Sequence, residues 1–163
     1  MDLGIGVTNS EITFSMRNGS RFLEEKIIGY DVTSYSNMSE NTLIKLKKEI
    51  EKVMKHINPT YERISSVVVA YPMSFNLLKI SDLKMLFKKL DIDVFRFIDA
   101  GIARGLHIYE KTKINSDGKH VCCIGNDKRF IELCLFEMGD GVVETLQNRC
   151  FECEDVNAYS YIA

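Results

Sequence analysis

Apolar and polar residues alternate along the first thirty residues. A period of two is typical of strands that bury one face. Polar turn residues interrupt the alternation at Thr8–Ser10 and at Asn18-Gly19, and Asn-Gly is a strong signal for a two-residue hairpin turn. The chain is therefore predicted to open with a three-stranded antiparallel meander. Its apolar positions are Ile5 and Val7, then Ile12, Phe14 and Met16, then Phe22, Ile27 and Ile28.

The apolar spacing becomes helical after residue 38, following a polar segment at 31–38 that predicts a loop. Ser39 is suited to begin the helix because its hydroxyl can accept a backbone N–H. Apolar residues then recur at intervals of three and four, which gives one apolar stripe and one charged face. The stripe comprises Leu43, Leu46, Ile50, Val53, Met54 and Ile57, and Pro59 follows its end.

Strands and helices alternate over the next fifty residues. Ser66–Tyr71 is a β-branched run, which is typical of a strand buried on both faces. The pattern then predicts a helix at 77–90, a strand at 94–98 and a helix at 99–110. This alternation after a meander predicts an α/β fold with parallel strands.

A polar segment that contains Asn115-Ser116-Asp117-Gly118 predicts a linker. Period-two alternation returns after it, so the chain is predicted to end in a second β-meander. Its strands are expected at 121–124, 130–136 and 142–146, with a turn at Gly139–Gly141. The predicted organisation is a first unit at 1–112, a linker at 113–119 and a second β-meander at 120–163.

Composition and charge exclude several classes of protein. Apolar residues make up 45% and charged residues 27% of the chain, as in ordinary globular proteins. The net charge of -2 gives no footprint for nucleic acid. The basic run at 45–48 is followed by Glu49 and Glu51, which indicates a solvated helix face. No apolar run approaches the roughly twenty residues that cross a bilayer, so the protein is predicted to be soluble, cytoplasmic and without membrane contact.

Five cysteines are expected to stay reduced in such a compartment. Cys150 and Cys153 have the C-x-x-C spacing that can serve zinc or redox chemistry. A four-ligand zinc site would need two further ligands, for which Cys122, Cys123 and His120 are candidates. We favour the alternative interpretation, in which the cysteines are free structural thiols that pack as small apolar side chains.

Four segments spread over most of the chain resemble the motifs of one family. They read G-I-G-V-T-N-S at Gly4–Ser10, V-V-A-Y-P-M-S-F-N at Val68–Asn76, V-F-R-F-I-D-A-G-I-A at Val94–Ala103, and a segment ending in D-G-V-V-E at Cys122–Glu144. In this order they resemble D-L-G-T-T-N-S, V-T-V-P-A-Y-F-N, V-L-R-I-I-N-E-P-T-A and F-D-L-G-G-G-T-F-D with its continuation to D-G-x-x-E. These are motifs of the nucleotide-binding domain of the seventy-kilodalton heat-shock chaperones.

The resemblance implies the actin-like ATPase fold, in which two lobes with ribonuclease-H-like sheets hold ATP and Mg²⁺ between them. Residues 1–112 would form the core of lobe I without its outer subdomain, and 120–163 the opening meander of lobe II. We expect no counterpart of the remaining part of lobe II or of a peptide-binding domain.

Phosphoryl transfer in this superfamily depends on carboxylates that hold hydrated Mg²⁺. Most of these positions carry other residues here. In the first loop and the N-E-P motif, Gly4 replaces Asp, Val7 replaces Thr, Thr8 is kept, Ala100 replaces Glu and Gly101 replaces Pro. In the second loop, Gly125 replaces Asp, Asp127-Lys128-Arg129-Phe130 replaces G-G-G-T, and Glu132 replaces the closing Asp.

Side chains in a phosphate loop block the approach of backbone N–H groups to an anion. Asp127 also repels phosphate, whereas Lys128 and Arg129 can pair with it. The degenerate nucleotide site therefore comprises Gly4, Gly6, Val7, Thr8, Asn9, Gly125, Lys128 and Arg129, with no catalytic or metal-binding residue. An alternative register aligns Asp2-Leu3-Gly4 with D-L-G and retains a carboxylate, but it leaves only Met1 for the preceding strand.

The sequence thus predicts a chaperone-related, non-hydrolysing pseudoenzyme that requires neither ATP nor Mg²⁺. It would bind a protein partner, or associate with itself, through unpaired sheet edges. A co-chaperone or ribosome-associated role follows by analogy with noncatalytic relatives. The alternative is a genuine ATP-binding chaperone lobe with weak ATPase activity.

Overall fold

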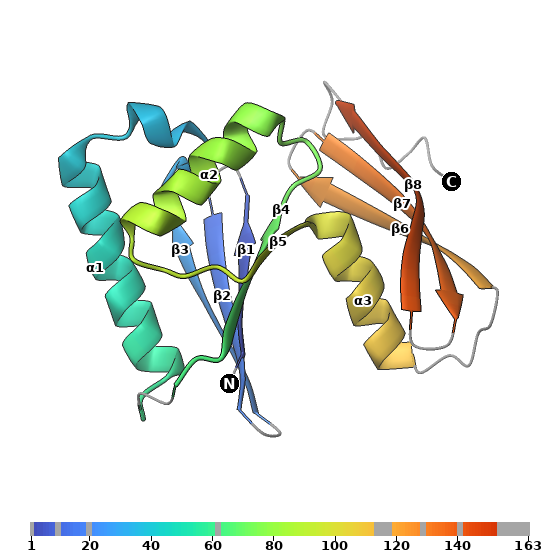
Figure 1. The fold of residues 1–163 in the computed structure, drawn as a ribbon, viewed down its shortest axis with the longest axis horizontal. Coiled ribbons are helices and arrows are strands. Elements are labelled where there is room, and N and C mark those ends of the chain that lie inside the picture. Colours follow the sequence, from blue (N-terminus) through green and yellow to red (C-terminus); the bar gives the residue numbers. More distant parts are fainter. Residues whose placement is uncertain are drawn as a thin grey trace. The chain divides into compact units, whose positions relative to one another are not determined.

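Eight strands, three α-helices and one 3₁₀-helix make up the described part of the computed structural model (Figure 1). The α/β class is confirmed. Contacts divide the chain into two units, which are described separately below. The first comprises Met1–Tyr71 and Phe75–Ile98, and the second Pro72–Ser74 and Asp99–Ala163. The structure describes residues 2–8, 11–18, 21–60, 63–112, 119–127, 130–139 and 142–152.

The first unit contains a five-stranded mixed sheet in the order β3-β2-β1-β4-β5. Neighbouring strands of the meander are antiparallel, whereas β1 pairs with β4 in parallel. The predicted meander is therefore confirmed, and so is a parallel strand after the first long helix. The strands are β1 (Asp2–Val7), β2 (Glu11–Asn18), β3 (Arg21–Ile28), β4 (Ser66–Tyr71) and β5 (Arg96–Asp99).

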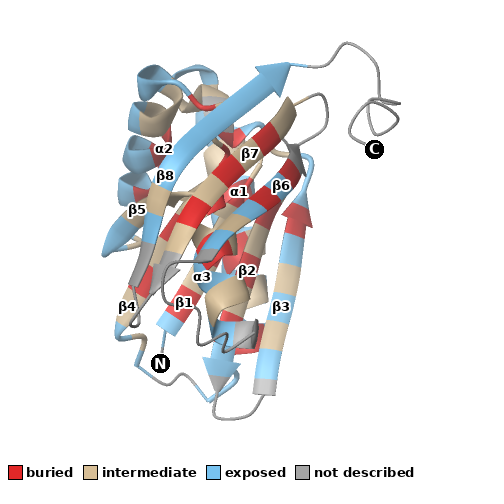
Figure 2. Ribbon diagram, turned by 90° about the vertical axis from the view of Figure 1, so that its right-hand side faces the viewer, coloured by how far each residue is buried: buried red, intermediate tan, exposed pale blue. Residues whose placement is uncertain are grey.

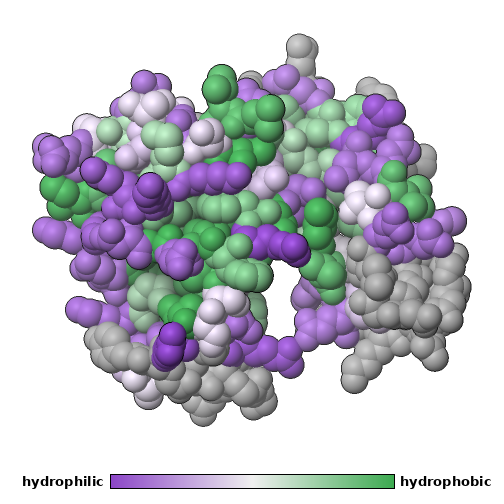
Figure 3. All heavy atoms as spheres, viewed as in Figure 1, coloured by the Kyte–Doolittle hydropathy of each residue, from purple (hydrophilic) through white to green (hydrophobic). Residues whose placement is uncertain are grey.

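One face of this sheet packs against the α-helices α1 (Glu40–Ile57) and α2 (Leu77–Lys89). The cap predicted at Ser39 is confirmed, because Thr42 N donates to its side chain, and Asn76 caps α2 in the same way by accepting from Lys79 N. Hydrophilic side chains gather over the outer surface of α1 in Figure 3, as its charged stripe predicts. The buried core includes Leu3, Ile5, Val7, Ile12, Phe14, Met16, Leu46, Ile50, Val69, Leu83, Leu86 and Phe87.

The other face of the first sheet carries small and polar side chains. Gly4 and Gly6 alternate with buried residues along β1, and they lie opposite Ser15 and Thr13 of β2. On β4, Val68 is only half-buried. The prediction that Ser66–Tyr71 is buried on both faces is thus wrong for its second face.

Two connections differ from the sequence prediction. The predicted loop at 31–38 contains a 3₁₀-helix, η1 (Val32–Asn37), that packs near α2 through a hydrogen bond from Ser36 to Asp82. The predicted strand at 94–98 begins only at Arg96, although Phe95 N already donates to the carbonyl of Val67 in β4 at 2.8 Å. At the end of α2, Ile92 N donates to the carbonyl of Phe87, and Asp91 adopts the left-handed conformation with φ of 59°.

The second unit contains a three-stranded antiparallel sheet in the order β6-β7-β8, with α3 (Ala100–Thr112) packed on one face. The predicted second meander is confirmed, although its strands extend further than the apolar pattern indicated. A register shift between Leu135 and Phe136 interrupts the pairing of β7 with β8. Figure 2 shows buried residues alternating along β7 and an exposed β8. The strands are β6 (Lys119–Asp127), β7 (Phe130–Gly139) and β8 (Val142–Glu152).

By its contacts, α3 belongs with this second sheet. The linker predicted at 113–119 lies almost wholly outside the described residues. Among the residues that are described, no helix combines the length and the apolar character needed to span a membrane.

Candidate functional site

The predicted first phosphate loop, Gly4–Ser10, begins within β1, and its described residues are engaged locally. Val7 is buried in the core of the first unit. Thr8 closes the turn toward β2, because its N–H donates to the carbonyl of Glu11 at 2.9 Å and its hydroxyl accepts from Glu11 N at 3.1 Å. Asn9 lies outside the described residues.

The two glycines of this loop have different surroundings. A Cβ atom at Gly4 would lie 2.8 Å from the hydroxyl of Ser15, which itself donates to the Gly4 carbonyl. A side chain at position 4 would therefore require the Ser15 hydroxyl to move. At Gly6 the nearest atom, Cβ of Thr13, would be 3.8 Å away, so a small side chain fits there.

Of the three second-loop residues in the predicted nucleotide site, Gly125 is described, whereas Lys128 and Arg129 lie outside the described part. Gly125 is buried in β6 and is the direct cross-strand neighbour of Glu132 in β7. The first-loop residues belong to the first unit and Gly125 belongs to the second. Within the first unit, Gly4, Gly6 and Val7 lie on β1 and Thr8 follows its end. Within the second unit, Gly125 belongs to a cluster on β6, β7 and α3.

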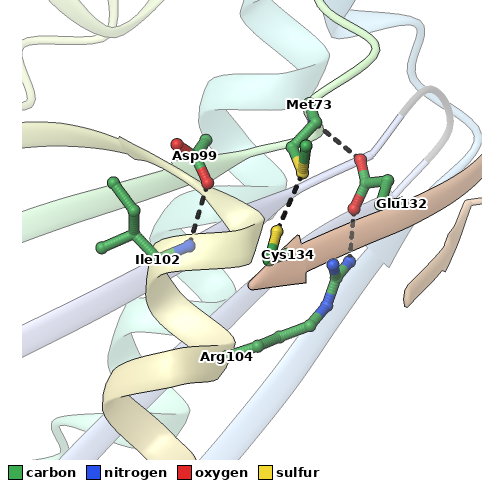
Figure 4. Close-up of polar contacts among 6 residues, drawn as sticks. All are labelled: Met73, Asp99, Ile102, Arg104, Glu132 and Cys134. Carbon is green, nitrogen blue, oxygen red and sulfur yellow. Dashed lines mark hydrogen bonds and ion pairs between the residues drawn. The ribbon is translucent and has the colours of Figure 1, made fainter. Parts of the chain in front are cut away.

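That cluster is organised by a buried ion pair between Arg104 of α3 and Glu132 of β7 (Figure 4). Arg104 Nη2 donates to Glu132 Oε2 at 2.6 Å, and Met73 N donates to Glu132 Oε1 at 2.6 Å. Both carboxylate oxygens are thus occupied, by one charged and one neutral donor. Glu132 is completely buried, whereas the Arg104 side chain keeps 31% exposure.

Gly125 provides the space for the guanidinium group of Arg104. A Cβ atom at this position would overlap Nη1, Nη2 and Cζ of Arg104. Nη1 is buried and has no hydrogen-bond partner among the described residues. The guanidinium group of Arg104 therefore fills the space beside Gly125 on β6. In the chaperone motif that this segment resembles, the position of Gly125 is held by the Asp of the second phosphate loop.

Two further glycines let α3 approach the sheet closely. A Cβ atom at Gly101 would overlap the thiol of Cys134, and one at Gly105 would lie 2.9 Å from the ring of Phe136. The two glycines are four residues apart and share one helix face. Asp99 precedes the first residue of the helix and caps it, because its carboxylate accepts from Ile102 N at 2.9 Å. Close approach brings Arg104, on the next turn, within reach of Glu132.

The thiols at this contact are buried and held in the neutral form. Cys134 donates to the sulfur of Met73 at 3.2 Å. Burial, and secondarily the nearby Asp99 carboxylate, raise the pKa of Cys134 to about 11. Burial also raises the pKa of Cys123, the cross-strand neighbour of Cys134. Since the thiolate is the reactive form, both cysteines are suited to packing rather than to nucleophilic chemistry.

The candidate site therefore combines a carboxylate that is paired with a guanidinium group and two buried thiols in their protonated form. Among the described residues, no group of three or more His, Cys, Asp or Glu side chains is placed to hold a metal ion. Cys153, half of the C-x-x-C motif, lies outside the described part. His120 and Cys122 are exposed, on the sheet face opposite to buried Cys123.

Sequence reasoning identified Glu132 as the last carboxylate of the motif, but it missed Arg104 and Met73. A signal for Arg104 was present. It lies on the turn of α3 that follows Gly101 and precedes Gly105, beside small residues that mark a close helix contact. No comparable signal exists for Met73, whose backbone N–H rather than its side chain binds Glu132.

Comparison with known proteins adds no assignment. No protein-family model matches the chain, and no curated protein sequence is significantly similar to it.

Proposed function

We propose that this protein is a non-hydrolysing relative of the seventy-kilodalton heat-shock chaperones that acts by binding a protein partner. The first unit supports this proposal through the succession of its elements. A meander is followed by a helix, a strand parallel to β1, a second helix and a fifth strand. That succession is expected for the ribonuclease-H-like sheet of an actin-like lobe.

The observation that carries the proposal is the pairing of Glu132 with Arg104. In the alignment with the chaperone motifs, Glu132 takes the position of the Asp that closes the second phosphate loop. A carboxylate that assists Mg²⁺ must offer its oxygens to the metal or to its water ligands. Both oxygens of Glu132 instead accept hydrogen bonds from protein donors. The positive charge beside this carboxylate is supplied by a guanidinium group, so metal binding would require displacing a buried ion pair.

The extent of β1 supports the favoured alignment of the first loop. The strand runs from Asp2 to Val7, so Gly4 lies within it and has strand residues on both sides. Asp2 stands at its amino end, where its carboxylate accepts from the Ser66 hydroxyl at 2.7 Å. Ligands of open α/β sheets bind at the carboxyl ends of strands. Asp2 is therefore poorly placed to serve as the loop carboxylate of the alternative alignment.

A fluorescent ATP analogue titrated into the protein, with and without Mg²⁺, tests the proposal. We expect no Mg²⁺-dependent binding, because Glu132 is committed to Arg104 and Met73, and Gly4 and Gly125 stand where the family has Asp. Micromolar binding that requires Mg²⁺ and is lost in Asp2→Asn would instead favour the ATP-binding alternative. Asp82→Asn is the matched control, since this carboxylate lies on α2 and its partner is Ser36.

A further inference from the structure

Strand β3 forms an open edge of the first sheet. Among the described residues it is the terminal strand in the order β3-β2-β1-β4-β5, and it pairs with β2 on one side only. Figure 2 shows this strand at the margin of the sheet. The backbone N–H and C=O groups along the free side of such an edge can accept a further strand.

The outward face of this edge carries an unusual set of side chains. Phe22 and Ile28 are 65% and 71% exposed, and they stand near the two ends of the strand. Between them, on the same face, lie Glu24 and Lys26. Glu24 has no hydrogen bond or ion pair within the described residues. The strand thus presents an apolar residue, an acid, a base and an apolar residue in that order.

This order is complementary to itself when two copies pair antiparallel about Glu25. Phe22 of each copy then lies opposite Ile28 of the other, and Glu24 lies opposite Lys26. Directly opposed side chains in antiparallel strands have Cβ atoms about 4.5–5.5 Å apart, close enough for both kinds of contact. We propose that β3 is a self-association surface whose partner is β3 of a second copy of this chain. This inference rests on the proposed partner-binding role and names the partner.

The apolar side chains of the inward face also fit this register. Leu23 would lie opposite Ile27, so apolar residues meet on that face too. The two Glu25 carboxylates would face each other across the symmetry axis, and each lies 3.1 Å from Nε2 of its own His56. A register shifted by one residue is less favourable, because Glu24 would meet Glu25 and Leu23 would meet Lys26. Charge complementarity therefore selects pairing about Glu25.

Two opposite charge reversals test the register by sedimentation equilibrium of the full chain. We expect the wild type to be a dimer, and Glu24→Lys and Lys26→Glu each to associate about a hundredfold more weakly, because like charges face each other twice. A mixture of the two variants should restore the dimer, since every facing pair is then opposite in charge. Lys26 also pairs with Glu11 at 2.9 Å. Lys26→Glu loses that contact both by itself and in the mixture, so the loss does not explain a difference between the two samples.

Two further variants and a control complete the test. Phe22→Ser should weaken association about tenfold or more through loss of an aromatic contact, whereas the control Leu78→Ser, at an exposed apolar residue of α2, should not. Glu25→Gln should strengthen association by removing the like charges at the axis. A wild type that stays monomeric into the millimolar range, or a mixture that associates no better than its components, would overturn the proposal. Either result would leave the proposed absence of ATP hydrolysis intact, because hydrolysis is measured separately, by phosphate release from ATP.

Discussion

The two units bury their helices in different ways. In the first, α1 and α2 cover the sheet with aliphatic and aromatic side chains, and the most buried residues are all apolar apart from Asn58. In the second, α3 meets the sheet through glycines, thiols and the Arg104–Glu132 pair. A buried ion pair adds little stability over apolar residues of similar volume, because desolvation offsets the attraction. The contrast indicates that the first core maintains the fold, while the second preserves a particular arrangement of charge.

The largest expected effect comes from breaking that charge arrangement. Glu132→Ala should lower the free energy of unfolding by about 3–5 kcal/mol, because it leaves a partly buried guanidinium group and the N–H of Met73 without an acceptor. Urea unfolding measures this loss. Glu137→Gln, on the opposite face of β7, should change stability by less than about 0.5 kcal/mol.

The double variant Arg104→Met/Glu132→Leu sharpens the comparison. This variant makes the contact between α3 and its sheet apolar, like the helix contacts of the first unit. It should therefore recover most of the stability lost in Glu132→Ala. If the double variant were as unstable as Glu132→Ala, packing rather than charge would account for the loss.

A smaller effect is expected from the close approach of α3. Gly101→Ala should cost about 1–3 kcal/mol by overpacking against the Cys134 thiol. Adding Cys134→Ala should make the combined loss smaller than the sum of the single losses. Gly6→Ala in the first sheet is the matched control, since its Cβ has room, and thermal unfolding should show little change. Equal losses at the two glycines would contradict the described contact.

Helix capping in the first unit should contribute less again. Asn76→Ala removes the acceptor for Lys79 N and should cost about 1 kcal/mol, whereas Asn76→Gly should cost only a few tenths. Chemical denaturation of the two variants measures the difference. No difference between Ala and Gly would show that the cap geometry does not determine the cost.

The smallest net effect is expected at the end of α2. Asp91→Gly relieves a left-handed backbone conformation but removes the exposed ion pair with Lys47 at 2.7 Å. These changes oppose each other, so the melting temperature should stay close to that of the wild type. Asp91→Ala loses the ion pair without the backbone relief and should melt lower than Asp91→Gly.

Much of the fold could be predicted because local rules and tertiary packing agree. Ser39 and Asn76 begin their helices, and period-two alternation correctly predicts β1, β2 and β3. The strand that starts at Arg96 begins two residues later than predicted, since the apolar pattern already includes Val94 and Phe95. Periodicity follows the side chains, so it does not locate the residue at which regular backbone pairing begins.

The candidate site was less predictable. Glu132 was singled out from its motif position, yet its significance depends on Arg104, which lies twenty-eight residues earlier in sequence. Their meeting requires the glycines of α3 and the pairing of β6 with β7. A pattern read along one strand or helix does not contain such a contact between two elements. The roles expected for Asn9, Lys128 and Arg129 remain predictions.

Phosphate release from ATP by the full chain, with ATP and Mg²⁺ in large excess over the protein, tests the central claim most directly. The account predicts no rate above that of buffer, and the same result for Glu132→Gln, because the carboxylate is already committed to Arg104 and Met73. A Mg²⁺-dependent turnover that Glu132→Gln abolishes would contradict it.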